Sequence, residues 1–292
     1  MTPEIGALGR VARVHAPAKI NLFLHVRGKR DDNFHELESL IVFADLGDRL
    51  EFTAASSVHL EVAGPFAHDL AQETDNLVLR AARTLHGENW GAAIKLEKNL
   101  PIASGVGGGS ADAAATLRGL NNLWTLNKSE AELCSLAETL GSDVPACVLS
   151  RPLLMRGRGE VLDPLPAFPS LPLLLVNPRV AVSTRQVFGA LKGFDERRAP
   201  MPSCVTGARD LAAYLEHTRN DLRDAAVGLA PVIGDVLHAI EAQSGCAFAQ
   251  MSGSGATCFG LFENDAACVT AAQTITKAQP GWWVEPTRTQ GV

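Results

Sequence analysis

The sequence predicts an α+β fold in two domains, residues 1–165 and residues 166–292. A chain of 292 residues is long enough for two domains. Glycines and prolines accumulate between residues 156 and 172, which is typical of a domain boundary. Beyond this boundary the predicted elements follow the order strand, helix, strand, strand, helix, strand. That is the order of a ferredoxin-like sandwich, here with additional helical material.

Hydrophobic periodicity defines the elements of the N-terminal domain, which we predict to be an α/β sandwich. Alternating apolar and polar positions predict strands at residues 11–26, 50–62 and 93–98. A helix is predicted to open at Thr74-Asp75-Asn76 and to continue through Leu85. The segment Ser129-Glu130-Ala131-Glu132 has the pattern of a capping box, so another helix begins there, and we expect Gly141 to end it.

The C-terminal domain shows a series of short strands and helices. Its strands are predicted at residues 173–176, 246–251, 257–262 and 282–285. Its helices are predicted at residues 183–191, 231–242 and 265–277. Residues 193–207 are predicted to form a polar loop.

Net charge and cysteine usage exclude several classes of function. The chain carries 26 Lys and Arg residues against 32 Asp and Glu residues, a net charge of −6, and has no basic run. We therefore expect neither nucleic acid nor an anionic membrane as a partner. The six cysteines are scattered, so neither a disulfide framework nor a zinc site is expected. Because the sequence shows no signal peptide and no apolar run of membrane length, we expect a cytoplasmic protein.

A glycine-rich segment within residues 98–115 carries most of the functional information. Four of the five residues 105–109 are glycine, directly ahead of a helix that Ser110 is expected to cap. Glycines let backbone N–H groups approach a ligand closely, and the first turn of a helix favours phosphate. The alternative is a tight turn without a ligand, but so many glycines favour phosphate binding.

Two common phosphate-binding loops do not match this segment. A Walker loop ends in Gly-Lys-Ser/Thr, and no lysine follows Gly109. The dinucleotide fingerprint Gly-x-Gly-x-x-Gly requires a glycine at position 110, which is a serine here. The segment therefore belongs to another type of phosphate loop.

Two charged residues have sequence contexts that suit catalysis. Lys19 interrupts an apolar strand, where the alternative is an ordinary exposed lysine. Asp143 precedes a short helix, where the alternative is a helix N-cap. Phosphoryl transfer gives a reason to pair them, because the attacking hydroxyl needs a carboxylate to accept its proton. A neighbouring lysine keeps that carboxylate ionised and stabilises a developing alkoxide.

Two further segments allow either a binding role or a purely structural one. Phe34 can stack on a flat heterocycle and His35 can hydrogen-bond its edge. The alternative is a core phenylalanine beside a surface histidine. Residues 251–256, Met-Ser-Gly-Ser-Gly-Ala, form either a simple hairpin turn or a second glycine-lined approach to an anion.

Together these motifs resemble those of the GHMP kinases, the superfamily named for galactokinase, homoserine, mevalonate and phosphomevalonate kinases. Residues 101–111 resemble its ATP-binding motif, and Gly253-Ser-Gly-Ala256 resembles its C-terminal glycine motif. Three segments point to a member that acts on a cytidine-diphosphate-linked polyol. They are Pro17-Ala-Lys-Ile-Asn-Leu22, Phe34-His-Glu-Leu37 and Gly141-Ser-Asp-Val-Pro145. The resemblance runs from about residue 16 to the final predicted strand.

The resemblance implies a kinase in which ATP donates its γ-phosphate to the 2-hydroxyl of that small-molecule polyol. By position, Asp143 resembles the catalytic base of the family and Lys19 its partner, with Asn21 beside the same hydroxyl. His35 resembles the residue that reads the cytosine edge, between aromatic positions that sandwich the ring. These aromatic positions are Phe34 and Phe188.

The resemblance also implies an ATP site and its metal. Asn76 and Lys98 are implied to line the adenine pocket. The residues implied to wrap the triphosphate are Pro101, Ile102, Ala103, Ser104, Gly105, Val106, Gly107, Gly108, Gly109, Ser110 and Ala111. Mg²⁺ is expected to arrive with ATP. No protein ligand is named for it, because glycines stand where other family members have a metal-binding serine.

The chain departs from the family pattern at four further positions. Phe34 stands where tyrosine is usual, so stacking is kept but a phenolic hydrogen bond is lost. Asn33 replaces a usual glycine and Ser142 a common alanine. Asp112 places a carboxylate in the predicted first turn of the phosphate-binding helix, and we expect it to face away from the phosphate.

Two alternative functions stay open. One is another GHMP kinase of the homoserine or mevalonate type, and the other is a non-catalytic nucleotide or metabolite sensor on the same fold. The pair Phe34-His35 argues against the first, and the presence of both Lys19 and Asp143 argues against the second. The sequence leaves open a monomer or a weak homodimer, the order of substrate binding, and whether residues 193–207 close over the site.

Overall fold

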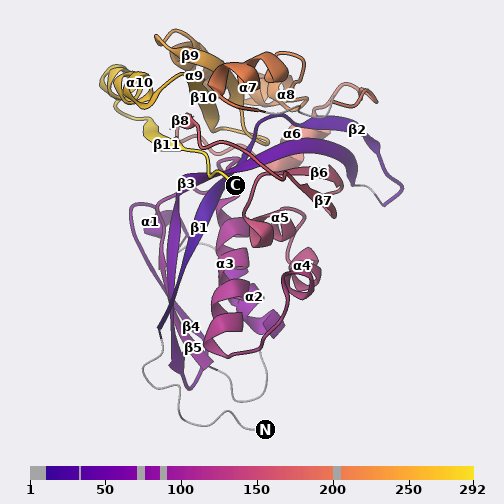
Figure 1. The fold of residues 1–292 in the computed structure, drawn as a ribbon, viewed down its shortest axis with the longest axis vertical. Helices are drawn as coiled ribbons and strands as arrows, with labels where there is room; N and C mark the ends of the chain where they lie inside the picture. The colour runs from indigo at the N-terminus through magenta and orange to yellow at the C-terminus, as the bar shows by residue number, and fades with distance from the viewer. Residues whose placement is uncertain (1–10, 33, 71–75, 86–90, 200–204) are drawn as a thin grey trace. The chain divides into compact units, whose positions relative to one another are not determined.

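A computed structural model describes residues 11–32, 34–70, 76–85, 91–199 and 205–292 (Figure 1). The chain divides into two compact units. The first unit comprises Met1–Ala18, Gly47–Ile102 and Gly107–Ser150. The second unit comprises Lys19–Leu46, Ala103–Val106 and Arg151–Val292. The two predicted domains, residues 1–165 and 166–292, stay a prediction.

The strands of the first unit include the second half of β3 (His35–Ala55), the longest strand. It pairs antiparallel with β5 (Gly91–Glu97), which pairs parallel with β4 (His59–Ala63). β1 (Val11–Asn21) also pairs with β3. Buried and less buried residues alternate along much of β5, as expected for a strand with one face in the core. The strand predicted at residues 93–98 is therefore confirmed as β5.

The helices of the first unit follow the glycine-rich segment or precede β5. They are α1 (Ala67–Leu70), α2 (Leu77–Leu85), α3 (Gly108–Leu123), α4 (Glu130–Glu138) and α5 (Val144–Leu149). α3 packs against β3 at Gly119, where a Cβ would lie 2.2 Å from the ring of Phe52. This close approach requires glycine and brings the buried side of α3 onto the sheet.

The predicted boundaries of α2 and α4 have different outcomes, and α2 ends at Leu85 as predicted. The predicted start of α2 at Thr74-Asp75 lies outside the described residues. The capping box of α4 is confirmed, since Ser129 and Glu132 exchange hydrogen bonds. The expectation that Gly141 ends this helix is wrong. α4 ends at Glu138, and a final turn follows it in which the backbone N–H groups fold back onto earlier carbonyls.

The second unit contains the first half of β3 in a sheet with shorter strands. β2 (His25–Lys29) pairs antiparallel with β3, and β3 pairs antiparallel with β6 (Leu153–Gly157). β6 in turn pairs with β7 (Val161–Pro164). β6 and β7 were not predicted, because their residues lie at the edge of the glycine- and proline-rich stretch.

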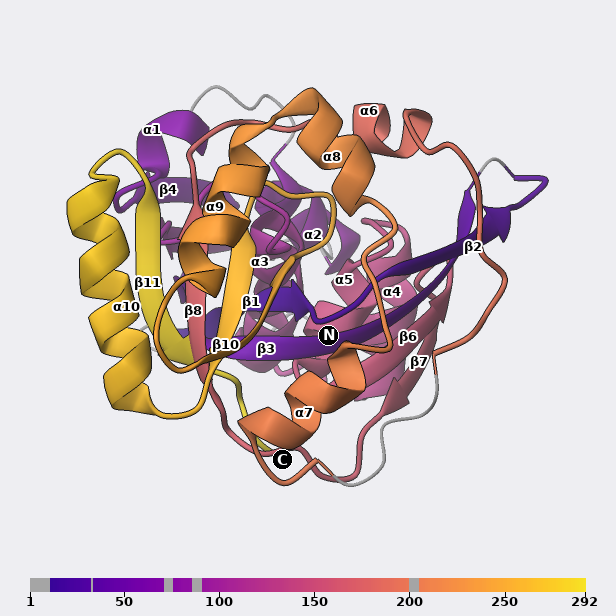
Figure 2. The ribbon, with the colours of Figure 1, turned by 90° about the horizontal axis from the view of Figure 1, so that it is seen from above.

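The second unit also contains a separate four-stranded antiparallel sheet. Its strands are β8 (Pro172–Asn177), β9 (Cys246–Met251), β10 (Cys258–Phe262) and β11 (Trp283–Arg288). Their order in the sheet is β11-β8-β10-β9. Val176 shares one buried cluster with Ile240 of α9 (Val232–Glu241) and Ile275 of α10 (Asp265–Ala278), so both helices cover the same face (Figure 2). The predicted ferredoxin-like arrangement is confirmed.

Additional helices lie in the second unit between β8 and α9. They are α6 (Thr184–Gly189), α7 (Ala208–Leu215) and α8 (Arg223–Leu229). α6 is the short helix predicted at residues 183–191, and the hydroxyl of Ser183 caps it. α7 and α8 were not predicted. Among the described residues, we find no helix with both the length and the hydropathy of a membrane span.

Candidate active site

Three segments that are far apart in the sequence meet in the second unit. The backbone N–H of Lys19 donates to the carbonyl of Val106 at 2.9 Å. The hydroxyl of Ser252, in the turn between β9 and β10, donates to the carbonyl of Gly105 at 2.9 Å and accepts from the N–H of Asn21 at 3.1 Å. The lysine motif, the middle of the glycine-rich segment and the C-terminal glycine motif therefore form one hydrogen-bonded cluster.

Glycine is required at two positions where these segments cross. Gly105 has a φ of +80°, and a Cβ there would lie 2.4 Å from the carbonyl oxygen of Ser252. Gly253 has a φ of +56°, and its Cβ would lie 3.1 Å from the carbonyl oxygen of Gly105. A side chain at either position would strain the backbone and push the two segments apart. The prediction of a hairpin turn at residues 251–256 is confirmed, and its approach to an anion stays a prediction.

Lys19 is buried, with 3 % of its surface exposed, which excludes the surface lysine that the sequence left open. Its Nζ donates to Oδ1 of Asn21 at 3.0 Å. Nδ2 of Asn21 donates to Oγ of Ser39 at 2.8 Å, and Ser39 donates to the carbonyl of Phe23 at 2.6 Å. This chain of hydrogen bonds fixes the direction of a buried ammonium, a group that is costly to remove from water.

The helix after the glycine-rich segment begins with glycines. α3 starts at Gly108, so Ser110 lies inside the helix and its expected role as N-cap is wrong. Gly107 is the N-cap, with a left-handed φ of +63° that glycine adopts without strain, and no side chain caps this end. Asp112 is the fifth helical residue, so its expected place in the first turn is wrong. The positive end of the macrodipole of this 16-residue helix suits a phosphate.

The two residues implied to line the adenine pocket belong to the first unit. Lys98 is buried, and its Nζ lies 2.5 Å from Oδ2 of Asp48 and 2.7 Å from Oδ2 of Asp112. Burial alone would lower the pKa of Lys98, but the Asp112 and Asp48 carboxylates raise it above its ordinary value. Oδ1 of Asn76 accepts from the N–H of Val78 at the start of α2. The adenine-binding roles of both residues stay predictions.

Asp143 stands at the N-cap position of α5, yet its side chain makes no capping hydrogen bond, so the plain cap that the sequence left open is wrong. At the other end of α5, the guanidinium of Arg118 donates to the carbonyls of Cys147 at 2.6 Å and Val148 at 3.1 Å. Burial lowers the pKa of Arg118 from its ordinary value. Arg118 thereby ties α5 to α3 and fixes the short helix that directly follows Asp143. The pairing of Asp143 with Lys19, which belongs to the other unit, stays a prediction.

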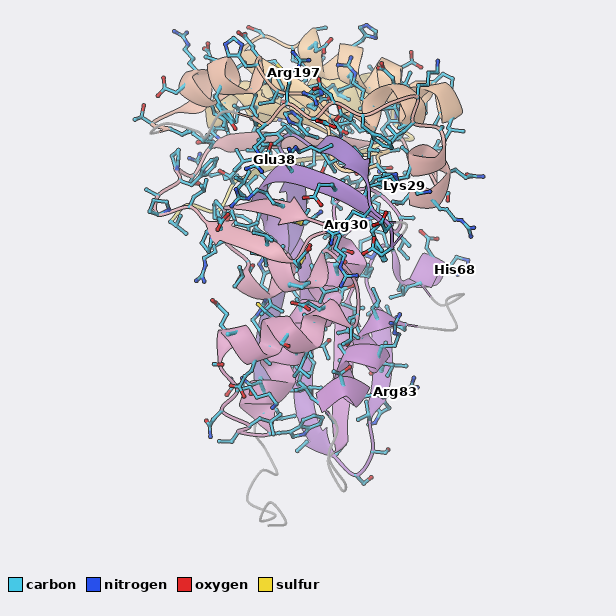
Figure 3. The ribbon with its side chains drawn as sticks, turned by 90° about the vertical axis from the view of Figure 1, so that its right-hand side faces the viewer. Lys29, Arg30, Glu38, His68, Arg83 and Arg197 are labelled. Carbon is cyan, nitrogen blue, oxygen red and sulfur yellow. The ribbon has the colours of Figure 1, made fainter. Side chains whose placement is uncertain are left out.

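Aromatic side chains surround His35 in the second unit. The ring of Phe188 stacks on His35, with centroids 4.7 Å apart and planes inclined by 27°. Phe194 approaches the same imidazole with its centroid at 5.8 Å. Burial, and then the charge of Lys29 at the end of β2 (Figure 3), lower the pKa of His35. The imidazole is therefore neutral at neutral pH, with one hydrogen-bond donor and one acceptor.

Phe34 is exposed over 48 % of its surface, so the alternative of a core phenylalanine is wrong. The guanidinium carbon of Arg158 lies 5.3 Å from the centroid of its ring, a cation–π contact. Phe188 lies against His35 itself. The sandwich of a cytosine ring between Phe34 and Phe188 stays a prediction. Asn33, one of the departures from the family pattern, lies outside the described residues.

The segment 194–199, which belongs to the predicted polar loop, is tied to β2 and β3. Arg27 of β2 donates to a carbonyl of this segment at 3.2 Å. The carboxylate of Glu38 of β3 accepts from the N–H of Ala199 at 2.9 Å, and Glu38 is labelled in Figure 3. Phe194 thus reaches His35 from a segment with fixed attachment points. The last part of the predicted loop includes residues that lie outside the described ones.

Three residues that hold one of the described segments in place were not singled out from the sequence. Phe194 could have been recognised as a candidate binding residue, since it is an aromatic residue in an otherwise polar loop. Asn220 donates from Nδ2 to the carbonyls of Met251 and Gly253, both at 2.8 Å, and so fixes the C-terminal glycine turn. No local pattern marks Asn220 or Arg118, because their partners are distant in the sequence.

Metal binding by side chains has little support in the part of the chain that the structure describes. No group of three or more His, Cys, Asp or Glu side chains there could hold a metal ion. Asp48 and Asp112 are close to each other, but the ammonium of Lys98 contacts both of them. Mg²⁺ brought by ATP stays a prediction.

Comparison with known proteins gives consistent matches along the chain. The family model of the GHMP kinases N terminal domain matches residues 76–151, and that of the GHMP kinases C terminal matches residues 206–278. A 4-diphosphocytidyl-2-C-methyl-D-erythritol kinase of Ruegeria pomeroyi is 53 % identical over 92 % of this chain and 95 % of its own length. The protein of the same name from Paramagnetospirillum magneticum is 48 % identical over 94 % of this chain and 96 % of its own.

A solved structure agrees with these relatives. It is a crystal structure of a 4-(cytidine 5'-diphospho)-2C-methyl-D-erythritol kinase, with a TM-score of 0.75 and 34 % identity. The match covers 96 % of this chain and 100 % of that one. The likeness therefore includes both matched family regions and the segments between them.

Proposed function

The chain belongs to the GHMP kinases, and we propose that it transfers the γ-phosphate of ATP to the 2-hydroxyl of 4-diphosphocytidyl-2-C-methyl-D-erythritol. The observation that carries the proposal is the agreement of near-full-length relatives, at 53 % and 48 % identity, on one named activity. The reaction is a step of non-mevalonate isoprenoid, or terpenoid, biosynthesis.

Asp143 acts as the general base of this reaction. It accepts the proton of the attacking hydroxyl, whose oxygen bonds to the γ-phosphorus while the bond from that phosphorus to the bridging oxygen breaks and ADP leaves. Such assistance contributes a factor of about 10²–10⁴ in rate. Lys19 supplies positive charge beside the same hydroxyl, and its hydrogen bond to Asn21 fixes the direction of the ammonium. The burial of Lys19 supports this role, because a charge acts more strongly away from water.

The glycine-rich segment, residues 101–111, holds the phosphates of ATP. Left-handed backbone at Gly105 and Gly107 and the uncapped start of α3 support this assignment. Mg²⁺ accompanies ATP and neutralises part of its negative charge. In this proposal the chain contributes backbone donors to the phosphates and no side-chain ligand to the metal.

His35 and its aromatic neighbours bind the cytosine base. A neutral imidazole donates one hydrogen bond and accepts another, which suits a base edge that carries both an amino donor and acceptors. Phe188 and Phe194 hold the plane of the imidazole. Phe34 offers an exposed ring face for stacking, an interaction of about 1–3 kcal/mol per base.

We place this activity in the cytoplasm, in a protein that is a monomer or a weak homodimer. The net charge of −6 and the scattered cysteines support this placement. Neither nucleic acid nor a membrane takes part in the proposed reaction.

A coupled assay of ADP release tests the proposal. The protein is supplied with MgATP and, in separate reactions, with the cytidyl polyol, its uridyl counterpart, homoserine and mevalonate. We expect fast ADP release with the cytidyl polyol and much slower release with the uridyl compound, because uracil lacks the amino donor of cytosine. Equal rates with these two compounds would contradict base recognition by His35.

The other two acceptors separate the remaining alternatives. Fast ADP release with homoserine or mevalonate would favour another GHMP kinase. Binding of ATP without ADP release from any acceptor would favour the sensor.

A further inference from the structure

We infer that Asp48, Lys98 and Asp112 form a buried charge triad that positions both ends of the glycine-rich segment, and that its surplus negative charge weakens the binding of nucleotide phosphate when Asp112 is ionised. The inference rests on the proposal that this segment binds the phosphates of ATP. Lys98 thereby has a structural role in addition to the predicted contact with adenine. All three residues belong to the first unit.

The triad joins three elements of that unit. Asp48 comes from β3, Lys98 directly follows β5, and Asp112 lies in α3. Nζ of Lys98 donates to one oxygen of each carboxylate, at 2.5 Å and 2.7 Å. The three side chains have at most 3 % of their surface exposed. In such a site water screens the charges very little, so their balance matters more than at a surface.

The two ends of the glycine-rich segment both rest on this triad. At its entry, Oδ1 of Asp48 accepts from the backbone N–H groups of Asn99 at 2.5 Å and Leu100 at 2.9 Å. At its exit, a Cβ on Gly108 would lie 3.1 Å from Nζ of Lys98, so the backbone at the start of α3 lies directly against the ammonium. A change in the triad therefore displaces both ends of the segment together.

The triad has two carboxylates for one ammonium, and they are not equivalent. Asp48 accepts from Lys98 and from two backbone N–H groups, whereas Oδ1 of Asp112 is buried with no hydrogen-bond partner. Asp112 is therefore the carboxylate that takes up a proton more readily. Burial, together with the charge of Asp48, raises its pKa to about 7 against the attraction of Lys98. Lys98 and Asp48 are the charged groups that act on it among the described residues.

The charge of this triad faces the end of α3 that suits a phosphate. When Asp112 is protonated, the triad is neutral, and when Asp112 is ionised the triad carries one negative charge. That charge opposes the favourable potential of the helix terminus. By linkage, a bound phosphate also favours the protonated form of Asp112.

The affinity for MgATP, measured by calorimetry between about pH 6 and about pH 8, tests the charge effect. We compare the wild type with Asp112→Asn, so that the ratio of their affinities cancels any titration of the nucleotide. The wild type is expected to lose about three- to tenfold more affinity than the variant as the pH rises. Asp235→Asn, at an exposed position in the first turn of α9, is the matched control and should follow the wild type.

The positioning role is tested at Asp48 with two variants that remove the same charge. Asp48→Asn keeps an oxygen for the N–H groups of Asn99 and Leu100, whereas Asp48→Ala leaves them without it. We expect Asp48→Ala to bind MgATP about tenfold more weakly than Asp48→Asn, with equal affinity of both for the cytidyl substrate. With rising pH, Asp48→Asn should lose as little MgATP affinity as Asp112→Asn does. The charge effect can therefore still be tested if Asp112→Asn does not fold.

Three results would count against these ideas. A wild-type pH profile parallel to those of the charge-removing variants would overturn the charge effect. Equal MgATP affinities of Asp48→Ala and Asp48→Asn would overturn the positioning role. A wild type that does not bind MgATP at any pH would instead contradict the proposed function itself.

Discussion

The two buried lysines, Lys19 and Lys98, are equally hidden from water but differ in the groups that receive their hydrogen bonds. Nζ of Lys19 donates to the neutral amide of Asn21, and Nζ of Lys98 donates to two carboxylates. The hydrogen bond to Asn21 helps to orient the ammonium of Lys19. Asp48 and Asp112, when both are ionised, carry more charge than the single ammonium of Lys98 that contacts them. Burial alone therefore does not mark a catalytic lysine, because Lys98 is as deeply buried as Lys19 and is held by two carboxylates of its own unit.

The largest effect is expected on stability, from Lys98→Met. This change leaves two carboxylates buried without a cation, so we expect the free energy of unfolding to fall by about 3–5 kcal/mol. Lys98→Met in an Asp112→Asn background is the matched variant; it leaves one carboxylate without the cation instead of two, so we expect a smaller loss. Urea unfolding of both variants measures the difference. Equal losses of stability would contradict the part that the two carboxylates play in holding Lys98.

The next effect is expected on turnover, from Asp143→Asn. An amide cannot accept the proton of the attacking hydroxyl, so we expect turnover to fall by a factor of about 10² or more. The affinity for ATP should stay close to that of the wild type, as measured by calorimetry beside the ADP-release assay. Turnover within a factor of about three of the wild type would remove the general-base assignment.

A smaller effect is expected from His35→Ala, a change outside both lysine clusters. Loss of a hydrogen bond and of stacking should weaken binding of the cytidyl substrate by about five- to twentyfold. Binding of ATP should be unchanged. Leu229→Ala, at an exposed apolar position of α8, serves as the control for surface substitution. Equal losses of affinity for both ligands would contradict the role of His35 with cytosine.

A further effect is expected on the pH dependence of stability, from Asp112→Asn. The pKa of Asp112 is about 7 in the folded protein against an ordinary value of 3.8, so the folded protein holds a proton that the unfolded chain releases between these values. This group therefore contributes its full stability when the pH is below its ordinary pKa of 3.8. That stability is lost as the pH rises toward about 7. Asparagine does not titrate, so the variant should lose less stability over this range.

Thermal unfolding at a series of pH values measures this effect. Each 1 kcal/mol corresponds to roughly 2–4 °C in the unfolding midpoint for a chain of this size. A wild-type curve parallel to that of Asp112→Asn would contradict the raised pKa of Asp112.

The parts of the fold that could be predicted depend on neighbours a few residues apart. The capping box at Ser129 and the strand and helix order of the ferredoxin-like sheet are patterns of this kind. The cap at Ser110 was predicted wrongly because the glycines before it can themselves enter the helix, which begins two residues earlier. Short elements near the glycine- and proline-rich stretch, such as β6 and β7, show too little periodicity to be recognised.

The sequence predicts which motifs belong to the site, but it does not predict how these motifs contact one another. Lys19, Gly105 and the turn at Ser252 were each singled out, but their contact spans up to 231 residues of sequence and no local pattern encodes it. The triad is even harder to predict from the sequence. Asp48 lies 50 residues from Lys98, and its sequence context is that of an ordinary strand residue. Charge balance among distant residues is a property of the folded chain, and the sequence does not display it.

The most direct test of the proposed active site is a crystal structure of the protein with a non-hydrolysable ATP analogue and the cytidyl polyol. We expect the glycine-rich segment to surround the phosphates, with Nζ of Lys19 and the carboxylate of Asp143 both within about 3–4 Å of the acceptor hydroxyl. A structure with these two side chains on opposite sides of the bound ligands, or both turned away from them, would contradict it.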